Sequence, residues 1–464
     1  MVFFEKSYKK KGSKMKKILS VLLVVVVVAV AAVYYVSDNV AKNYEKTIGE
    51  LDKIDGIKIS NSMYEKGLFD SNATFDLIVS KDLLDKIDES AGAQDLVFKV
   101  DTELKHGLTA LFSGAHVKSK IFIQNDFIKN MVSVFLGSNL IMTADANVGF
   151  GGSKDVLLNL SDIDFKDNKS VTLTTKGVSI AVDLDPSNKA KSVKFNVSKA
   201  YIENKDENFS LNMENAFADI DYEQPFVIDS VFDWSIVPYA SKSGFKIFEI
   251  SADNYQESIK INIADVIYDS VLKINNGLAN FKENVKAAGI SVNDSKYKEL
   301  ALDAELLNFD VSVLEDYIKN LDKELASSDF GGYEEFLSDK FKKDRDEFLS
   351  SDPIVKVNSL TLKNVDNNAL NLNLTLGFKG YDKKLTDAQN IKSLIVNGKI
   401  NIDTTLAEFF GQIPEVGMFE PMLKEGEILK SDGKGVKTEF KFDKDKMDII
   451  FNEKVGLFDL IRGF

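Results

Sequence analysis

The sequence predicts an α+β fold that is predominantly β, in which an N-terminal transmembrane helix precedes an extended, curved antiparallel sheet with a helical insert. Three observations predict it: a long apolar run near the N-terminus, many short segments of alternating apolar and polar residues, and a middle region with apolar residues every three or four positions. Alternation is typical of a strand with one wet face, and the longer period is typical of an amphipathic helix.

The apolar run at residues 18–36 predicts a single membrane span. Its nineteen residues would reach roughly 28 Å as a helix, close to the thickness of the hydrocarbon layer. Seven lysines precede the run, so residues 1–17 are predicted to form a cytoplasmic basic tail and the bulk of the chain to lie outside. Cleavage at Ala29-Val30-Ala31 as a signal peptide, and a start at Met15 instead of Met1, remain alternatives.

Composition excludes several classes of function. The chain has no cysteine and only two histidines, His106 and His116, so thiol catalysis, Cys-ligated metals and a Ser-His-Asp triad are not expected. Residues 1–36 contribute +6 to a total charge of −14, so the rest carries −20. Because such an acidic surface repels phosphate backbones, no nucleic-acid partner is expected. No cofactor or metal is predicted.

Beyond the anchor, residues 37–55 are predicted to be a juxtamembrane segment and residues 56–265 an N-terminal β-rich region. Alternation marks its strands, as in Ser192–Val197, where apolar and polar side chains fall on opposite faces. The clearest predicted strands are Thr74–Val79, Val97–Leu104, Lys118–Ile123, Val156–Leu160, Val171–Leu173, Val178–Leu184, Val193–Val197 and Ser258–Ile263.

Residues 266–350 are predicted to form the helical insert. Apolar residues from Val266 to Val285 recur at helical spacing, and similar patterns follow at 313–325 and 333–349, before Pro353 ends the region. Residues 351–464 are predicted to be a C-terminal β-rich region that completes the same sheet. Its strands are Leu370–Phe378, Leu394–Asp403, Val436–Phe442 and Met447–Phe451.

The segment Ser62–Ala73 carries a family resemblance. It resembles the opening motif of the YdgA-like bacterial cell-envelope family, which contains the domain of unknown function 945 and begins with a Tyr-x-Arg-Gly-Trp-Phe-Ser-Ser-like stretch. The positions that correspond are Tyr64, Gly67, Leu68, Phe69 and Ser71, with Lys66 in place of the Arg and Leu68 in place of the Trp. The resemblance implies a protein of the bacterial inner membrane with its bulk in the periplasm and no known catalysis. The residues themselves indicate a turn with aromatic packing.

The most specific binding prediction concerns an apolar trough. Thirty-three phenylalanines and the strand at 370–378 suggest a concave apolar face, which is either a filled core or an open site for an acyl chain or extended peptide. The residues predicted to line it are Leu370, Leu372, Leu374, Leu376 and Phe378.

Function follows from these observations only as an expectation. We expect a non-enzymatic, membrane-anchored periplasmic binding or scaffold protein that holds a lipid or other apolar chain in the curved sheet. An alternative is an envelope assembly adaptor that contacts another protein through strand edges or the helices of 266–350. A hydrolase using paired carboxylates, such as Asp183 and Asp185, is less favoured because no motif supports it. Asp162, Asp164 and Asp167 lack the Gly and Glu of an EF-hand calcium loop.

Overall fold

The computed structural model describes most of the chain after the predicted anchor. The described residues are 52, 56–67, 70–82, 94–105, 115–149, 151–167, 170–226, 236–253, 258–293, 295–316, 339–410 and 414–458. The predicted tail at 1–17 and anchor at 18–36 lie outside these ranges, as do Leu68, Phe69 and His106. Within the described ranges, no helix has the length and apolar character that a membrane crossing requires.

The fold is predominantly β and antiparallel, and the chain divides into two compact units. The first unit comprises Met1–Glu203 and Gln224–Ile228, and the second comprises Asn204–Glu223 and Asp229–Phe464. This division falls near residue 204, whereas the regions expected from the sequence meet near residues 265 and 350.

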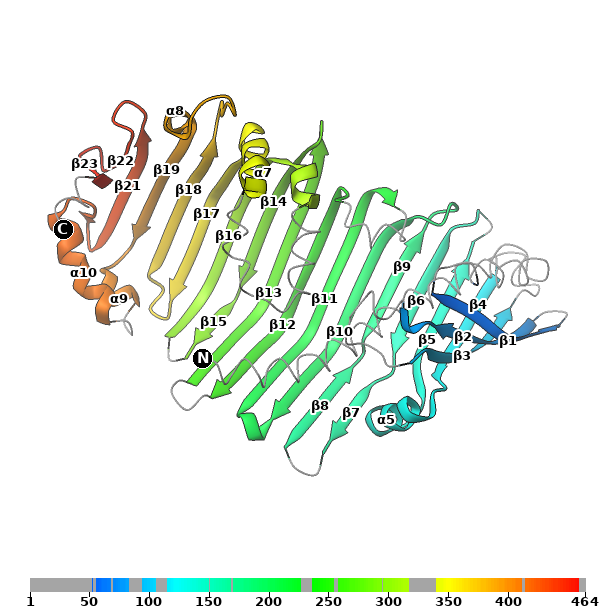
Figure 1. Cartoon of the computed structure of the whole chain (residues 1–464). Coiled ribbons are helices and arrows are strands. Elements are labelled where there is room, and N and C mark those ends of the chain that lie inside the picture. The colour runs from blue at the N-terminus through cyan, green and yellow to red at the C-terminus, as the bar shows by residue number, and fades with distance from the viewer. Residues whose placement is uncertain are drawn as a thin grey trace. The chain divides into compact units, whose positions relative to one another are not determined.

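Strands β1 to β6, β9 and β10 form a ladder in the first unit, in which each strand pairs with the next of this series (Figure 1). Strand β8 also pairs with β10 and with β7, and helix α5 lies against β7. The elements are β1 (Ile57–Lys66), β2 (Asp70–Val79), β3 (Leu96–Lys105), β4 (Ala115–Ile123), α5 (Asp126–Leu136), β5 (Leu140–Val148), β6 (Lys154–Leu160), β7 (Ile163–Lys166), β8 (Val171–Lys176), β9 (Ser179–Leu184) and β10 (Ala190–Asn204).

Alternation in these strands produces a buried face. Along β2, Phe75, Leu77 and Val79 are at most 3 % exposed, and they pair with the equally buried Val100, Phe98 and Leu96 of β3. The intervening residues are more exposed. Each strand predicted in this region matches an observed strand, with only Val178 falling outside β9, because period-two patterning places every second side chain on one face.

The second unit is a longer antiparallel ladder. Its series runs through β11, β12, β13, β14, β16, β17, β18, β19, β21, β22 and β23, with β15 beside β13 and β16 and with β20 on β21. The strands are β11 (Phe209–Phe226), β12 (Tyr239–Asp253), β13 (Ser258–Asn275), β14 (Leu278–Ala287), β15 (Gly289–Val292), β16 (Ser295–Asp310), β17 (Ile354–Asn364), β18 (Ala369–Phe378), β19 (Leu394–Ile402), β20 (Lys430–Asp432), β21 (Gly435–Asp443), β22 (Asp448–Phe451) and β23 (Val455–Gly456).

Short helices join or follow these strands. They are η1 (Lys205–Glu207), α7 (Asp339–Ser350), α8 (Asp387–Asn390), η4 (Ile391–Ser393), α9 (Leu406–Phe410) and α10 (Pro414–Glu425), and residues 311–316 are also helical. The helix predicted at 333–349 is therefore present as α7 over its described part. Of the helix predicted at 313–325, the structure describes only 313–316.

The prediction of a helix between Val266 and Val285 is wrong. This region forms β13 and β14, and β15 and β16 follow it, so the insert predicted at 266–350 is strand as far as Asp310. A two-residue turn joins β13 to β14, in which Asn276 has φ 52° and Gly277 has φ 77°. Both faces of β13 carry apolar residues, such as Ile267 on one and Leu272 on the other, and this arrangement imitates a helical period.

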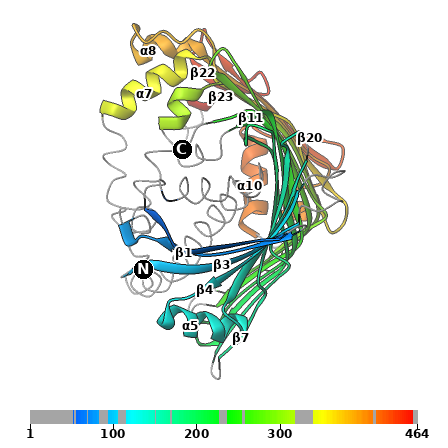
Figure 2. The same cartoon turned by 90° about the vertical axis from the view of Figure 1, so that its right-hand side faces the viewer.

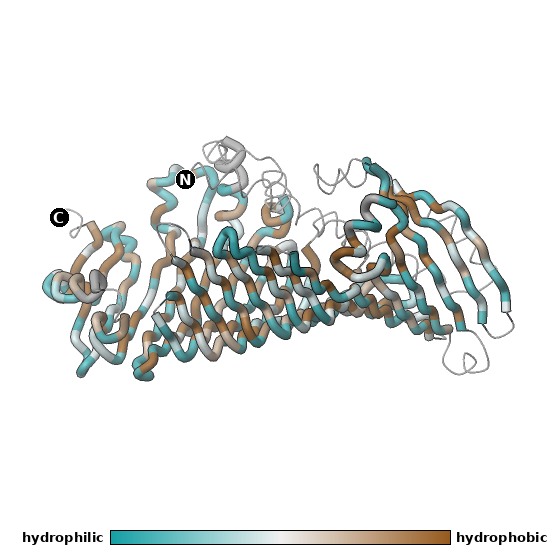
Figure 3. Tube along the Cα trace, turned by 90° about the horizontal axis from the view of Figure 1, so that it is seen from below, coloured by the Kyte–Doolittle hydropathy of each residue, from teal (hydrophilic) through white to brown (hydrophobic). Residues whose placement is uncertain are grey.

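The sheet of the second unit has one apolar and one polar face. Along β18, leucines alternate with Asn371, Asn373 and Thr375, and Figure 3 shows such alternation along the strands as changes of colour. The polar face is held by side-chain contacts between strands, among them Lys363 to Glu299 at 2.6 Å. We call the opposite, leucine-bearing face of β12 to β19 the apolar face.

Candidate functional site

The five predicted trough residues lie on the apolar face, in one row along β18. They pair across the ladder with other apolar side chains, because residues opposite each other in an antiparallel pair share a face. Leu372 lies between Leu360 and Ile400, and Leu376 lies between Val355 and Val396. Leu370, Leu374 and Phe378 extend the row at the same spacing.

These side chains are less buried than the core of the first unit. Leu376 is 38 % exposed, and Leu370, Leu372, Leu374 and Phe378 are all half-buried. By contrast, Leu77 in the first unit has no exposed surface. A contiguous row of partly exposed leucines is unusual on the surface of a soluble domain and is typical of a binding surface.

Helices α9 and α10 cover one end of the apolar face. Leu406 and Phe409 of α9 are buried with Ile402 and Val436, and Leu370 packs against this cluster. Buried Glu420 of α10 accepts a hydrogen bond from the Leu406 backbone N–H at 2.6 Å, which ties the two helices together.

Helix α7 covers the other end. The ring of Phe348 packs edge-on against Phe309 of β16, at 5.1 Å between centroids. Asn308 donates to the carbonyl oxygen of Asp352, and Ser351 donates to the carbonyl oxygen of Asn308. Figure 2 shows α7 and α10 on the same side of the strands of this unit.

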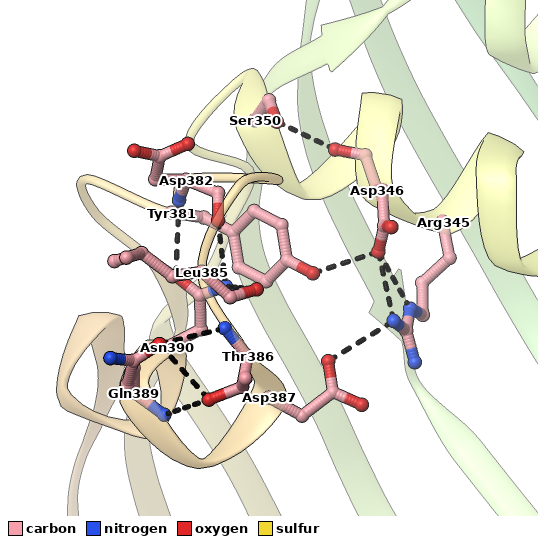
Figure 4. A network of polar contacts seen from close by, with 10 residues as sticks. All are labelled: Arg345, Asp346, Ser350, Tyr381, Asp382, Leu385, Thr386, Asp387, Gln389 and Asn390. Atoms are coloured by element: carbon pink, nitrogen blue, oxygen red, sulfur yellow. Dashed lines mark hydrogen bonds and ion pairs between the residues drawn. The ribbon is translucent and has the colours of Figure 1, made fainter.

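A polar network fixes α7 to the connection between β18 and β19 (Figure 4). The Tyr381 hydroxyl donates to Asp346 Oδ1 at 2.7 Å, and Arg345 bonds the same oxygen at 2.8 Å and Asp387 at 3.2 Å. Burial, then the hydrogen bond to Asp346, raises the pKa of Tyr381, and the bond to Asp346 raises the pKa of Arg345. Nearby, Thr386 and Gln389 form a capping box at the start of α8.

A polar cluster interrupts the apolar face at β12, β13 and β14. The Tyr239 hydroxyl lies 3.3 Å from Ser270 Oγ, which donates to Glu283 Oε1 at 3.0 Å. Ser270 has no exposed surface. Burial, followed by its hydrogen bond to the Glu283 carboxylate, raises the pKa of Tyr268 to about 12. We call Tyr239, Tyr268, Ser270 and Glu283 the polar cluster.

Sequence reasoning missed the polar cluster because it assigned residues 266–285 to a helix. Two signals could have found it. Asn276-Gly277 is a typical two-residue hairpin turn, and Tyr268, Ser270, Leu272 and Ile274 alternate with their neighbours as strand residues do.

The motif at Tyr64 to Ser71 builds the hairpin between β1 and β2. Tyr64 pairs with Ala73, and the Gly67 N–H donates to Oγ of the buried Ser71 at 3.3 Å. A Cβ on Gly67 would lie 2.0 Å from the Asp70 carbonyl oxygen, so the position requires glycine for close backbone approach. This position belongs to the first unit.

The geometry gives little support to a catalytic pair of carboxylates or to a metal site. Asp155 and Asp183 face each other on β6 and β9, and their mutual hydrogen bond, then burial, raises the pKa of Asp155. Both lie exposed on a sheet surface. His116 contacts Asp145 at 2.6 Å. Among the described residues, no group of three or more His, Asp or Glu side chains is arranged to hold a metal ion.

Comparison with known proteins identifies the family of the chain. The family model described as "Bacterial protein of unknown function (DUF945)" matches residues 15–454, a range that includes every strand from β1 to β22. No curated protein matches the chain. No solved structure matches it.

Proposed function

The chain belongs to this family of bacterial proteins of unknown function, and from that premise we propose that it is a non-enzymatic binding protein of the cell envelope. In this proposal residues 18–36 anchor it in the inner membrane, and the apolar face of the extended, curved sheet holds the acyl chain of a lipid or another apolar chain in the periplasm. The lysines before residue 18 support this orientation.

The observation that carries the proposal is the partial exposure of the leucine row between its two helical ends. Leu374 and Leu376 lie on β18 between the parts of the face that α9 and α7 occupy. An apolar chain laid along them would remove apolar surface from water, which is favourable by about 25 cal/mol per Å².

The test is native mass spectrometry of the full chain released from detergent micelles after purification from a bacterial envelope. We expect retained lipid on the wild type and a loss of at least about tenfold in Leu376→Asp, because a carboxylate within an apolar contact must be desolvated. The control is Thr375→Asp, which changes the opposite face of the same strand and should retain lipid. Wild-type protein without lipid would contradict the proposal, as would equal losses in both variants with the fold intact.

A second candidate function is an envelope assembly adaptor. It is favoured by α10, on which Met418 is 74 % exposed and Phe419 and Met422 are also exposed. Exposed Met and aromatic side chains are enriched at protein interfaces. Crosslinking in the envelope tests this function. Met418→Lys should abolish the crosslinks between α10 and a protein partner and should leave lipid retention unchanged.

A further inference from the structure

Two segments of the chain carry the residue pattern of an acceptor for N-linked glycosylation. The minimal pattern, an asparagine followed two positions later by serine or threonine, occurs seven times. Bacterial oligosaccharyltransferases also bind an acidic side chain two positions before the asparagine, whose carboxylate pairs with a basic group of the enzyme. Residues 206–210 (Asp-Glu-Asn-Phe-Ser) and 70–74 (Asp-Ser-Asn-Ala-Thr) meet this longer pattern. The five asparagines without the acidic residue are Asn159, Asn168, Asn196, Asn293 and Asn373.

The structure places Asn208 in the turn between β10 and β11. Asn208 follows η1 with φ 46°, and its backbone N–H donates to the carbonyl oxygen of Lys205 at 3.3 Å. Residues 205–208 are all exposed. N-linked glycans are bulky and occupy surface loops, because the transferase must bind the acceptor segment. The side chains of Asn208 and Asp206 are therefore both accessible to an enzyme.

Ser210 supplies the hydroxyl two positions after the asparagine. It is the second residue of β11 and pairs with Ser251 of β12, next to the first pair of that ladder. The end of a ladder opens at a lower free energy than its centre. Residues 206–210 can therefore enter an active site after only the first two positions of β11 have opened.

The second match, around Asn72, lies inside the sheet of the first unit. Asn72 is on β2, opposite Glu65 of β1 and Glu103 of β3, and its two neighbours along β2 are buried. The Thr74 hydroxyl, two positions later, donates to Asp101 Oδ1 at 3.1 Å. Removing this segment from the sheet would break strand pairing on both sides and expose buried side chains. Asn72 therefore provides an internal control with the same residue pattern.

We propose that Asn208 accepts an N-linked oligosaccharide from a bacterial oligosaccharyltransferase, which recognises Asp206 and Ser210. The donor is an oligosaccharide joined to a polyprenyl diphosphate. The Asn208 amide nitrogen forms a bond to the anomeric carbon of the first sugar and loses a proton to a base of the enzyme. The bond from that carbon to the diphosphate oxygen breaks, and polyprenyl diphosphate leaves. In the cell, this step rests on the periplasmic location in the proposed function.

The experiment incubates the purified full chain, in detergent micelles, with a bacterial oligosaccharyltransferase and a polyprenyl-diphosphate-linked oligosaccharide of known mass. Intact mass spectrometry should show the addition of one oligosaccharide, and peptide mapping should place it on Asn208. Asn208→Asp should accept none, although aspartate also tolerates the left-handed conformation of this turn. Asn72→Gln is the control and should accept as much oligosaccharide as the wild type.

Two further positions test recognition by the enzyme. Ser210→Thr should retain glycosylation and Ser210→Ala should lose it, because only threonine keeps the hydroxyl. Asp206→Asn should lower the rate at least about tenfold, because a hydrogen bond to a charged group is lost. A purely structural role of the turn would not produce this pattern.

The outcomes separate this inference from the proposed function. An unmodified wild type, equal modification of Asn72 and Asn208, or an unchanged rate in Asp206→Asn overturns the inference. None of these results bears on lipid retention, because residues 205–210 are not part of the apolar face of β12 to β19. Modification of the purified chain, but not of the chain made in cells with the same enzyme and donor, supports the acceptor site and contradicts the periplasmic location.

Discussion

Gly67 shows at the scale of a residue how the motif near the N-terminus acts. Its Cα approaches the Asp70 backbone so closely that any Cβ would overlap a carbonyl oxygen. Gly67→Ala should therefore lower the free energy of unfolding by about 1–3 kcal/mol, as overpacking against backbone does. Urea unfolding measures the change. Gly151→Ala is the control, since a Cβ there meets open space and should change stability by less than about 0.5 kcal/mol.

Asp155 and Asp183 give a prediction about pH. The hydrogen bond to Asp183 and burial raise the pKa of Asp155 in the folded state above its ordinary value, so its contribution to stability is present below that ordinary value and is lost as the pH rises through the folded pKa. Asp183→Asn should thus raise the free energy of unfolding by about 0.2–1 kcal/mol at pH 7, as expected for opposed like charges.

At pH 3 the same substitution should have little effect, because Asp155, whose pKa is raised, is then largely protonated and no longer opposes Asp183 as a like charge. Urea unfolding at the two pH values measures this difference. Asp164→Asn, which removes an exposed carboxyl from β7, serves as the control and should show no such pH dependence. An equal effect of Asp183→Asn at both pH values would show that repulsion between the carboxylates is not its cause.

At the scale of an element, Tyr381 determines how firmly α7 is held. Its hydroxyl donates to Asp346 in a network that also includes Arg345. Tyr381→Phe removes a hydrogen bond to a charged acceptor, so the amides of α7 should exchange about tenfold faster. Hydrogen exchange followed by mass spectrometry measures this rate. Unchanged protection of α7 together with faster exchange elsewhere would contradict the role assigned to the network.

Elements also show how far the sequence could predict the fold and the site. Strands with one buried face, such as β2 and β18, were predicted because period-two patterning reports directly on the two faces of a sheet. Strand β13 was missed because apolar residues on both of its faces imitate a helix, and the predicted helix was extended over β14, whose apolar residues alternate with Asn280, Lys282, Asn284 and Lys286. The leucine row was predicted, but the polar cluster beside it depends on cross-strand register between β12, β13 and β14, which a single sequence does not specify.

At the scale of the whole molecule, this member of a family of bacterial proteins of unknown function has a chemically asymmetric sheet in its second unit. One face of the second unit carries ion pairs and amides, and the other carries leucines with a polar cluster at one side. Residues 37–464 carry a strong negative charge, which repels anionic partners. A neutral ligand is therefore favoured over an anionic one. The membrane anchor at 18–36 stays a prediction from the sequence.

The most direct test of the central claim is photocrosslinking in living cells, with benzoylphenylalanine placed at Leu376 or, as the control, at Thr375. The account predicts that irradiation adds a mass in the lipid range to the full chain from position 376 and none from position 375, because only the first lies on the apolar face. Crosslinks from position 376 to another protein, or none at all, would contradict the claim that this face holds an apolar chain.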